Sequence, residues 1–140
     1  MTIIEFLTAR LDEDEERARR ATQGVWKIWG MAVMADQDGT SSADTAVDVA
    51  HTVMADEHGK PRTFDAQHIA RHDPARVLAE VEAKRRIVSL HHEPVSWQPG
   101  RDPSCSSIDY AEDSTDCETL RALALPYADH PDYREEWRVG

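Results

Sequence analysis

The stretch HIARHDPARVLAEVEAKRRIV, residues 68–88, decides the fold because it contains the junction between two helices. Aspartate is a favoured helix cap, and proline suits the first helical position, where its missing N–H costs nothing. Asp73 and Pro74 therefore predict a new helix from Pro74 to about His91, and we expect it to be the largest element of the chain. Apolar residues at helical spacing form its predicted buried face: Val77, Leu78, Val81, Val88 and Leu90, with Ile87 at the margin.

Two further helices are predicted on the N-terminal side of this junction. Asp65 is placed to cap a short helix that ends at about His72. At the start of the chain, Thr2 and Glu5 have the spacing of a capping box. The predicted N-terminal helix carries an apolar stripe of Ile3, Ile4, Leu7, Leu11 and Ala18, which Phe6 widens, and Gly24 is a plausible stop.

The residues between these helices favour extended structure. We expect one strand over residues 25–35 and a second over residues 47–54, and the pattern leaves open a short third strand near Thr63. Glycine, serine and aspartate between the first two runs are typical of turns. The predicted fold class is α+β: a small antiparallel sheet of two or three strands packed on a long central helix, with N-terminal and C-terminal helices, in a single domain over residues 1–140.

The C-terminal part of the chain is expected to be irregular and then helical. Prolines, serines and acidic residues fill about residues 93–116, which predicts a long loop. A last helix is expected from Thr115 or Asp116 to Pro126. Tyr127, Tyr133 and Trp137 follow it and are expected to pack back onto the core.

Charge and hydropathy limit the classes of partner. The formal net charge is -11, from 27 acidic and 16 basic residues, so we expect no direct nucleic-acid binding. Acidic clusters at residues 12–16 and 109–118 leave DNA mimicry open as an alternative. No run approaches the roughly 18 apolar residues of a membrane span. The N-terminus lacks the features of a signal peptide, which favours a cytoplasmic protein.

The strongest candidates for metal chemistry lie in and beside the predicted loop. Cys105, Cys117, His91 and His92 could together supply the four N or S ligands of a zinc ion, and His130 is a further candidate. Against zinc, the chain has no CxxC pair, and adjacent histidines are awkward joint ligands of one ion. A disulfide and two free thiols are the alternatives. We therefore expect no cofactor, with zinc as the exception to test.

Two other groups of polar residues resemble sites but favour structural roles. His68 and His72 have the spacing of a zinc-binding helix, yet Ile69 stands where a metalloprotease has glutamate. The carboxylates of the tail DHPDYREEW, residues 129–137, lack a pocket that would shift their pKa values. We expect the histidines to serve the helix junction and the tail to dock through its aromatic residues.

Three blocks of the chain resemble a known family: residues 1–22, residues 68–88 and the closing TLRALALPYADHPDYREEW, residues 119–137. They are similar to an uncharacterised domain-of-unknown-function family of actinobacteria (Streptomyces-like) and their phages. ATQGVWKIW, residues 21–29, also resembles the start of small accessory phage proteins, with Gln23 and Val25 where those have proline. The resemblance implies a phage or prophage accessory protein and no particular chemistry.

The sequence therefore predicts a non-catalytic protein that acts by binding a host or phage protein. We expect no membrane association, and the charged long helix would allow a homodimer. The alternatives are a small zinc-binding module that uses the Cys105 and Cys117 loop, and an acidic DNA mimic that inhibits a host protein.

Overall fold

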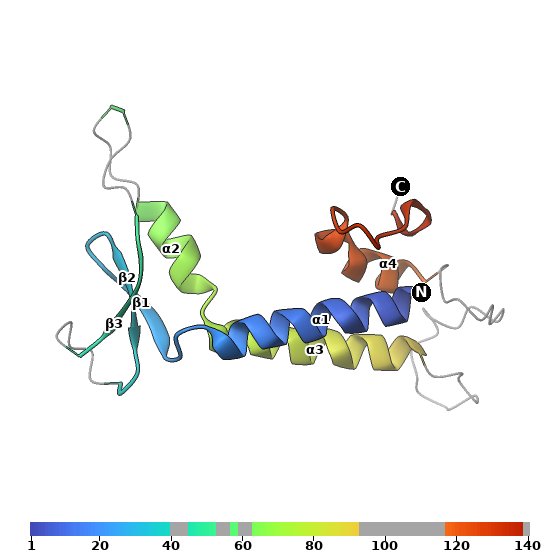
Figure 1. The fold of residues 1–140 in the computed structure, drawn as a ribbon, viewed down its shortest axis with the longest axis horizontal. Helices are drawn as coiled ribbons and strands as arrows, with labels where there is room; N and C mark the ends of the chain where they lie inside the picture. Colours follow the sequence, from blue (N-terminus) through green and yellow to red (C-terminus); the bar gives the residue numbers. More distant parts are fainter. Residues whose placement is uncertain (40–44, 53–56, 59–62, 93–116, 139–140) are drawn as a thin grey trace. The chain divides into compact units, whose positions relative to one another are not determined.

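The computed structural model describes residues 1–39, 45–52, 57–58, 63–92 and 117–138. The chain divides into two compact units, one of residues 1–13 with 81–140 and one of residues 14–80. The predicted α+β class is confirmed, while the single domain over residues 1–140 stays a prediction. The elements in chain order are α1 (Ile3–Arg20), β1 (Val25–Trp29), β2 (Ala32–Asp36), β3 (Val47–His51), α2 (Thr63–Arg71), α3 (Pro74–His92), α4 (Glu118–Ala124), η2 (Leu125–Tyr127) and η3 (Glu135–Trp137) (Figure 1).

The predicted capping box begins α1 and is confirmed. The Thr2 backbone N–H donates to Glu5 Oε2 at 2.7 Å, and the Glu5 backbone N–H donates to Thr2 Oγ1 at 3.2 Å. These two bonds satisfy backbone donors that a helix start otherwise leaves unpaired. The helix therefore begins at Ile3, where the sequence predicts it.

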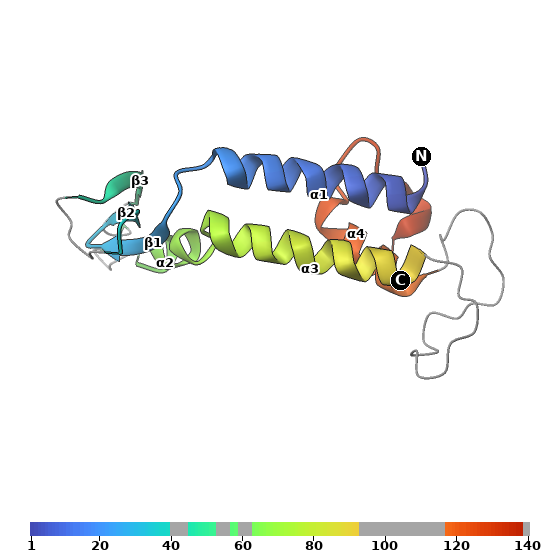
Figure 2. The same cartoon turned by 90° about the horizontal axis from the view of Figure 1, so that it is seen from below.

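The first unit is built on two helix segments that run side by side and antiparallel, the beginning of α1 and the end of α3 (Figures 1 and 2). An ion pair of 2.5 Å between Asp12 and Arg85 joins them. Leu90, predicted to be buried, is instead 50% exposed, because it lies two residues after the buried Val88 and so about 200° around the helix from it. The core residues of this unit are Ile3, Phe6, Leu7, Leu11, Val81, Val88, Leu120, Ala124 and Trp137.

The C-terminal aromatic residues pack around Phe6, as predicted. Trp137 is fully buried, and its ring centroid lies 5.1 Å from that of Phe6. Tyr127 and Tyr133 contact the same ring edge-on at 6.3 and 6.0 Å. Tilted and edge-to-face contacts at these distances are the favoured geometries of aromatic pairs. The tail after α4 is thus a component of the core of this unit.

The second unit contains a three-stranded antiparallel sheet in the order β1-β2-β3. The single strand expected over residues 25–35 is wrong, because the chain reverses at Gly30 and forms two strands there. Trp29 pairs with Ala32, so only Gly30 and Met31 make the turn, and Gly30 has a φ of 62°. A glycine with positive φ at the first position of a two-residue turn matches the twist of a hairpin.

The helix that contacts the sheet in this unit is α2, through both β1 and β2. Thr63, near which a short third strand is left open by the sequence, begins α2, two residues before the expected cap, and residues 59–62 lie outside the described residues. The Asp73 cap is confirmed: its Oδ1 accepts the Arg76 backbone N–H at 2.9 Å at the start of α3. Packing of the long helix α3 on the sheet stays a prediction.

Candidate functional site

A groove of about 450 Å³ lies in the second unit, between β1 and α2. Trp26 and Ile28 line it from β1, and Phe64, His68 and Arg71 line it from α2. Two aromatic rings, an aliphatic chain and two polar side chains thus surround one space. Such a mixture of apolar walls with few polar groups is typical of binding sites.

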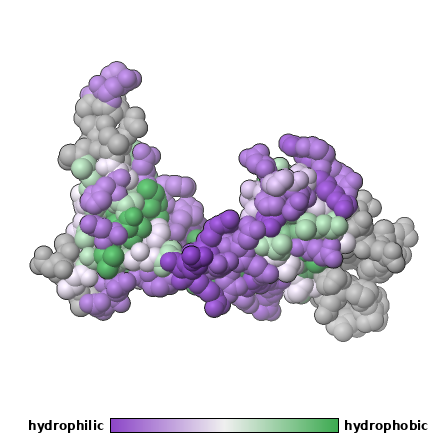
Figure 3. All heavy atoms as spheres, in the orientation of Figure 1, coloured by the Kyte–Doolittle hydropathy of each residue, from purple (hydrophilic) through white to green (hydrophobic). Residues whose placement is uncertain are grey.

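The apolar walls of this groove are open to solvent. Phe64 is 78% exposed and Ile28 is 38% exposed. Figure 3 shows hydrophobic residues gathered on the surface of this unit, within a largely hydrophilic molecule. An exposed apolar cluster rimmed by polar groups marks an interaction surface, because a partner that covers it removes apolar area from water.

The sheet register explains why these side chains share one face. Trp26 pairs with Ala35 and Ile28 with Val33, so alternation directs all four to the same side of the sheet. Val33 and Ala35 are fully buried, as is Ala66 of α2. The fully buried side chains of this face are therefore small, and the larger Trp26 and Ile28 line the groove.

The chain before β1 holds Trp26 in place. Its Nε1 donates to the Thr22 carbonyl oxygen at 2.9 Å. Gly24 has a φ of 116°, and a Cβ there would lie 2.6 Å from the Asp36 carbonyl oxygen. Only glycine fits this close approach without strain, so the turn that leads into β1 and Trp26 requires glycine at this position.

The polar rim of the groove is basic. Arg71 and His68 are both exposed, and Arg71 forms no hydrogen bond or ion pair within the described part of the chain. The chain has a net charge of -11, so an available guanidinium next to apolar side chains distinguishes this groove from the acidic remainder of the surface. Arginine with aromatic residues is also the composition of binding hot spots.

Of the predicted zinc ligands, the structure brings two together in the first unit. Cys117 Sγ lies 3.4 Å from His91 Nδ1, just before α4 and near the end of α3. Cys105 and the side chain of His92 lie outside the described residues. Within the described ranges, no group of three or more His, Cys, Asp or Glu side chains could hold a metal ion. The described part of the site is therefore a thiol–imidazole pair.

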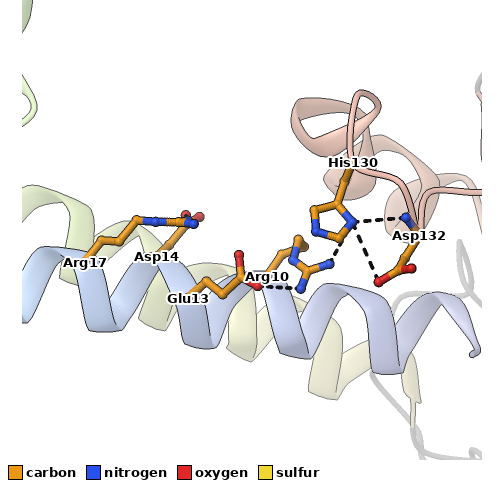
Figure 4. Close-up of polar contacts among 6 residues, drawn as sticks. All are labelled: Arg10, Glu13, Asp14, Arg17, His130 and Asp132. Carbon is orange, nitrogen blue, oxygen red and sulfur yellow. Dashed lines mark hydrogen bonds and ion pairs between the residues drawn. The ribbon is translucent and has the colours of Figure 1, made fainter.

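A polar network connects α1 to the C-terminal tail within the first unit (Figure 4). Arg10 is 7% exposed, and its guanidinium bonds to Glu13 at 2.6 Å and lies 3.1 Å from His130 Nδ1. The Asp132 backbone N–H donates to the same His130 nitrogen at 3.1 Å. Since Nδ1 receives two donors, it acts as the acceptor, and the imidazole links the tail to α1.

The tail carboxylates pair with arginines of the same segment. Glu135 bonds to Arg138 at 2.9 and 3.0 Å, and Glu136 bonds to Arg134 at 3.2 Å. The hydrogen bond from Arg138 lowers the pKa of Glu135, with the positive charge of Arg138 as the next cause. A general acid needs a raised carboxyl pKa, so this shift is opposite to that of an acid catalyst. The geometry favours the docking role expected for the tail.

The groove is not predicted by the sequence pattern. A single strand over residues 25–35 gives Trp26 and Ile28 no partners on β2 and does not indicate that α2 faces them. Gly30 was the available signal, because glycine between two apolar runs is a hairpin signature. The sequence does not single out Phe64, because a lone aromatic residue at a helix start is as consistent with burial in a core as with exposure in a groove.

Comparisons with known proteins identify the family and nothing further. Residues 1–139 match the model of a family of unknown function, DUF6221. No curated protein and no solved structure matches the chain. Among the described residues, no helix is both long and apolar enough to cross a membrane. With the family model covering residues 1–139, the chain belongs to the DUF6221 family of unknown function.

Proposed function

We propose that this protein is a non-catalytic accessory protein of phage or prophage type, which binds a host or phage protein through the groove between β1 and α2. The observation that carries the proposal is the 78% exposure of Phe64 beside Trp26, Ile28 and the available guanidinium of Arg71. A folded chain gains nothing by exposing this aromatic ring to water. Binding of a partner that covers the ring is favourable, because it removes the apolar area of the ring from water.

The partner expected at this groove is a segment with an apolar side chain next to a carboxylate. The apolar side chain would lie between Phe64 and Ile28, and the carboxylate would pair with Arg71. Arginine forms bidentate hydrogen bonds with carboxylates, which adds orientation to attraction. The acidic remainder of the surface would repel acidic partners elsewhere, so the groove is where such a segment would bind.

The proposal is tested by affinity purification from the source organism, with the parent chain and three variants as baits. The affinity of the purified partner is then measured for each of these four proteins. We expect Phe64→Ala to weaken binding by about 30-fold, as for a hot-spot aromatic residue. Arg71→Glu should weaken it at least as strongly by reversing the charge. Val25→Ala is the matched control, because Val25 is 55% exposed and alternation places it on the opposite face of β1. A partner that binds all four proteins equally would disprove the proposed site.

One observation favours a second candidate, a small zinc-binding module. The 3.4 Å contact between Cys117 Sγ and His91 Nδ1 joins two of the four predicted ligand residues. Elemental analysis of protein purified without chelator tests it. Stoichiometric zinc that disappears in the Cys105→Ser and Cys117→Ser double variant would support the module. Metal-free protein would exclude it and leave the groove proposal untouched.

The third alternative, DNA mimicry, is weakened at the acidic run of residues 12–16, whereas residues 109–116 of the second acidic cluster lie outside the described residues. A mimic needs carboxylates that stay available to a basic partner. The acidic run of α1 is instead matched by arginines. The five pairs are Asp12–Arg85, Glu13–Arg10, Asp14–Arg17, Glu15–Arg19 and Glu16–Arg20.

A further inference from the structure

His68 and His72 form a pair of neighbouring imidazoles on the surface of the second unit. His68 lies in α2 and His72 follows its last residue, so the two are one helical turn apart. Both side chains are exposed, and their ring centroids are 4.5 Å apart. Two imidazoles at this spacing can turn their nitrogens toward one point in solvent.

A hydrogen bond determines which His72 nitrogen is available. His72 Nδ1 lies 2.8 Å from the His68 carbonyl oxygen. A carbonyl oxygen only accepts, so Nδ1 must carry the proton in this bond. In the neutral ring, Nε2 then has a free lone pair. Metal-ligating histidines are typically held in this way, with one nitrogen donating to a backbone carbonyl and the other facing the metal.

We propose that His68 and His72 form a surface chelate for a divalent late transition metal ion. His72 Nε2 and one ring nitrogen of His68 supply two ligands, and water supplies the rest. Imidazole suits Zn²⁺, Ni²⁺ and Cu²⁺, and affinity is expected to be highest for Cu²⁺. The site needs neither Cys117 nor the proposed partner of the groove.

The charges around the pair are mixed. Asp65 is exposed one turn before His68 on the same side of α2, and its carboxylate attracts a cation. Arg71 opposes this attraction, although solvent and salt screen charges at an exposed site. The proposal therefore depends on the two nitrogens, and Asp65 adds attraction without being a ligand.

The test uses the full chain with Cys105→Ser and Cys117→Ser, so that thiolates cannot bind the ion. Calorimetric titration with Ni²⁺ and with Cu²⁺ at about pH 7.5 measures affinity, since ligation needs neutral imidazoles. We expect one site, and we expect His68→Ala and His72→Ala each to lower its affinity by about tenfold or more. NMR locates the ion independently, because paramagnetic Cu²⁺ should broaden the resonances of α2 first.

A matched control keeps the composition and changes only the spacing. In the Gln67→His and His68→Gln double variant, the second imidazole moves about 100° around the helix, away from His72. This variant should lose affinity as the alanine variants do. Unchanged affinity, Cu²⁺ broadening centred outside α2, or no binding by the parent chain would each overturn the proposal. Circular dichroism confirms that the variants keep their helix content.

Discussion

Replacing Trp137 with alanine removes the largest side chain in the core of the first unit. Trp137 is fully buried, and its ring lies 5.1 Å from Phe6 and 5.7 Å from Tyr133. The Arg134 guanidinium lies over the same ring, 5.6 Å from its centroid. The substitution would leave a cavity between the tail and α1, with the edge-on contacts of Tyr127 and Tyr133 to Phe6 as the remaining aromatic contacts of the tail there.

The expected loss of stability follows from the complete burial of Trp137. Truncating a fully buried tryptophan costs about 3–5 kcal/mol, from lost apolar transfer and from the cavity left behind. Domains of this size have unfolding free energies of about 5–15 kcal/mol. The variant should therefore lose a large share of its stability, and the loss should be concentrated in residues 1–13, 81–92 and 117–138.

Urea unfolding followed by circular dichroism measures the total effect, and hydrogen exchange shows where it occurs. Phe64→Ala is the matched control, because that aromatic side chain is 78% exposed and its truncation should change stability by no more than about 0.5 kcal/mol. A Trp137→Ala variant within about 1 kcal/mol of the parent would refute the docked tail. Unchanged amide protection at the start of α1 would refute it as well.

Three further predictions concern helix starts and the turn before β1. Gly24→Ala should lower the unfolding free energy by more than about 1 kcal/mol in urea titrations, because its φ of 116° and the nearby Asp36 carbonyl oxygen exclude a side chain. The backbone hydrogen bond from Thr2 lowers the pKa of Glu5, so this carboxylate stabilises α1 above the ordinary glutamate pKa. That contribution is lost as the pH falls through the lowered pKa. When the unfolding free energy is measured against pH, the Glu5→Gln variant should lack this part of the acid-induced loss of stability. Asp73→Ala should cost about 1 kcal/mol of stability by removing the cap of α3, and an unchanged urea midpoint would contradict this.

Local signals in the sequence were sufficient wherever a residue's own chemistry sets the structure. The capping box at Thr2 and Glu5 forms as predicted, since its hydrogen bonds join residues three positions apart. The Asp73 cap forms for the same reason. The helix over residues 74–92 and the aromatic tail were also predicted, because helical spacing and large aromatic side chains indicate burial in any context.

The strands show where local signals fail. The run at residues 25–35 is apolar except for Lys27 and Gly30, so its pattern alone does not show where the chain reverses. Gly30 makes the reversal, and the pairing of Trp29 with Ala32 then places Trp26 and Ile28 on one face. A one-residue change in that register would move both side chains to the other face.

The opening stretch, residues 68–88, shows the same division. By itself the sequence determined the helix junction at Asp73, the start of the long helix and the one-turn spacing of His68 and His72, because these depend on neighbours along the chain. Only the tertiary structure decided that α2 packs on β1 and β2 through Ala66 and leaves Phe64 in solvent. The groove exists because residues about forty positions apart meet across that packing, and the choice among such long-range pairings depends on burial of the whole chain.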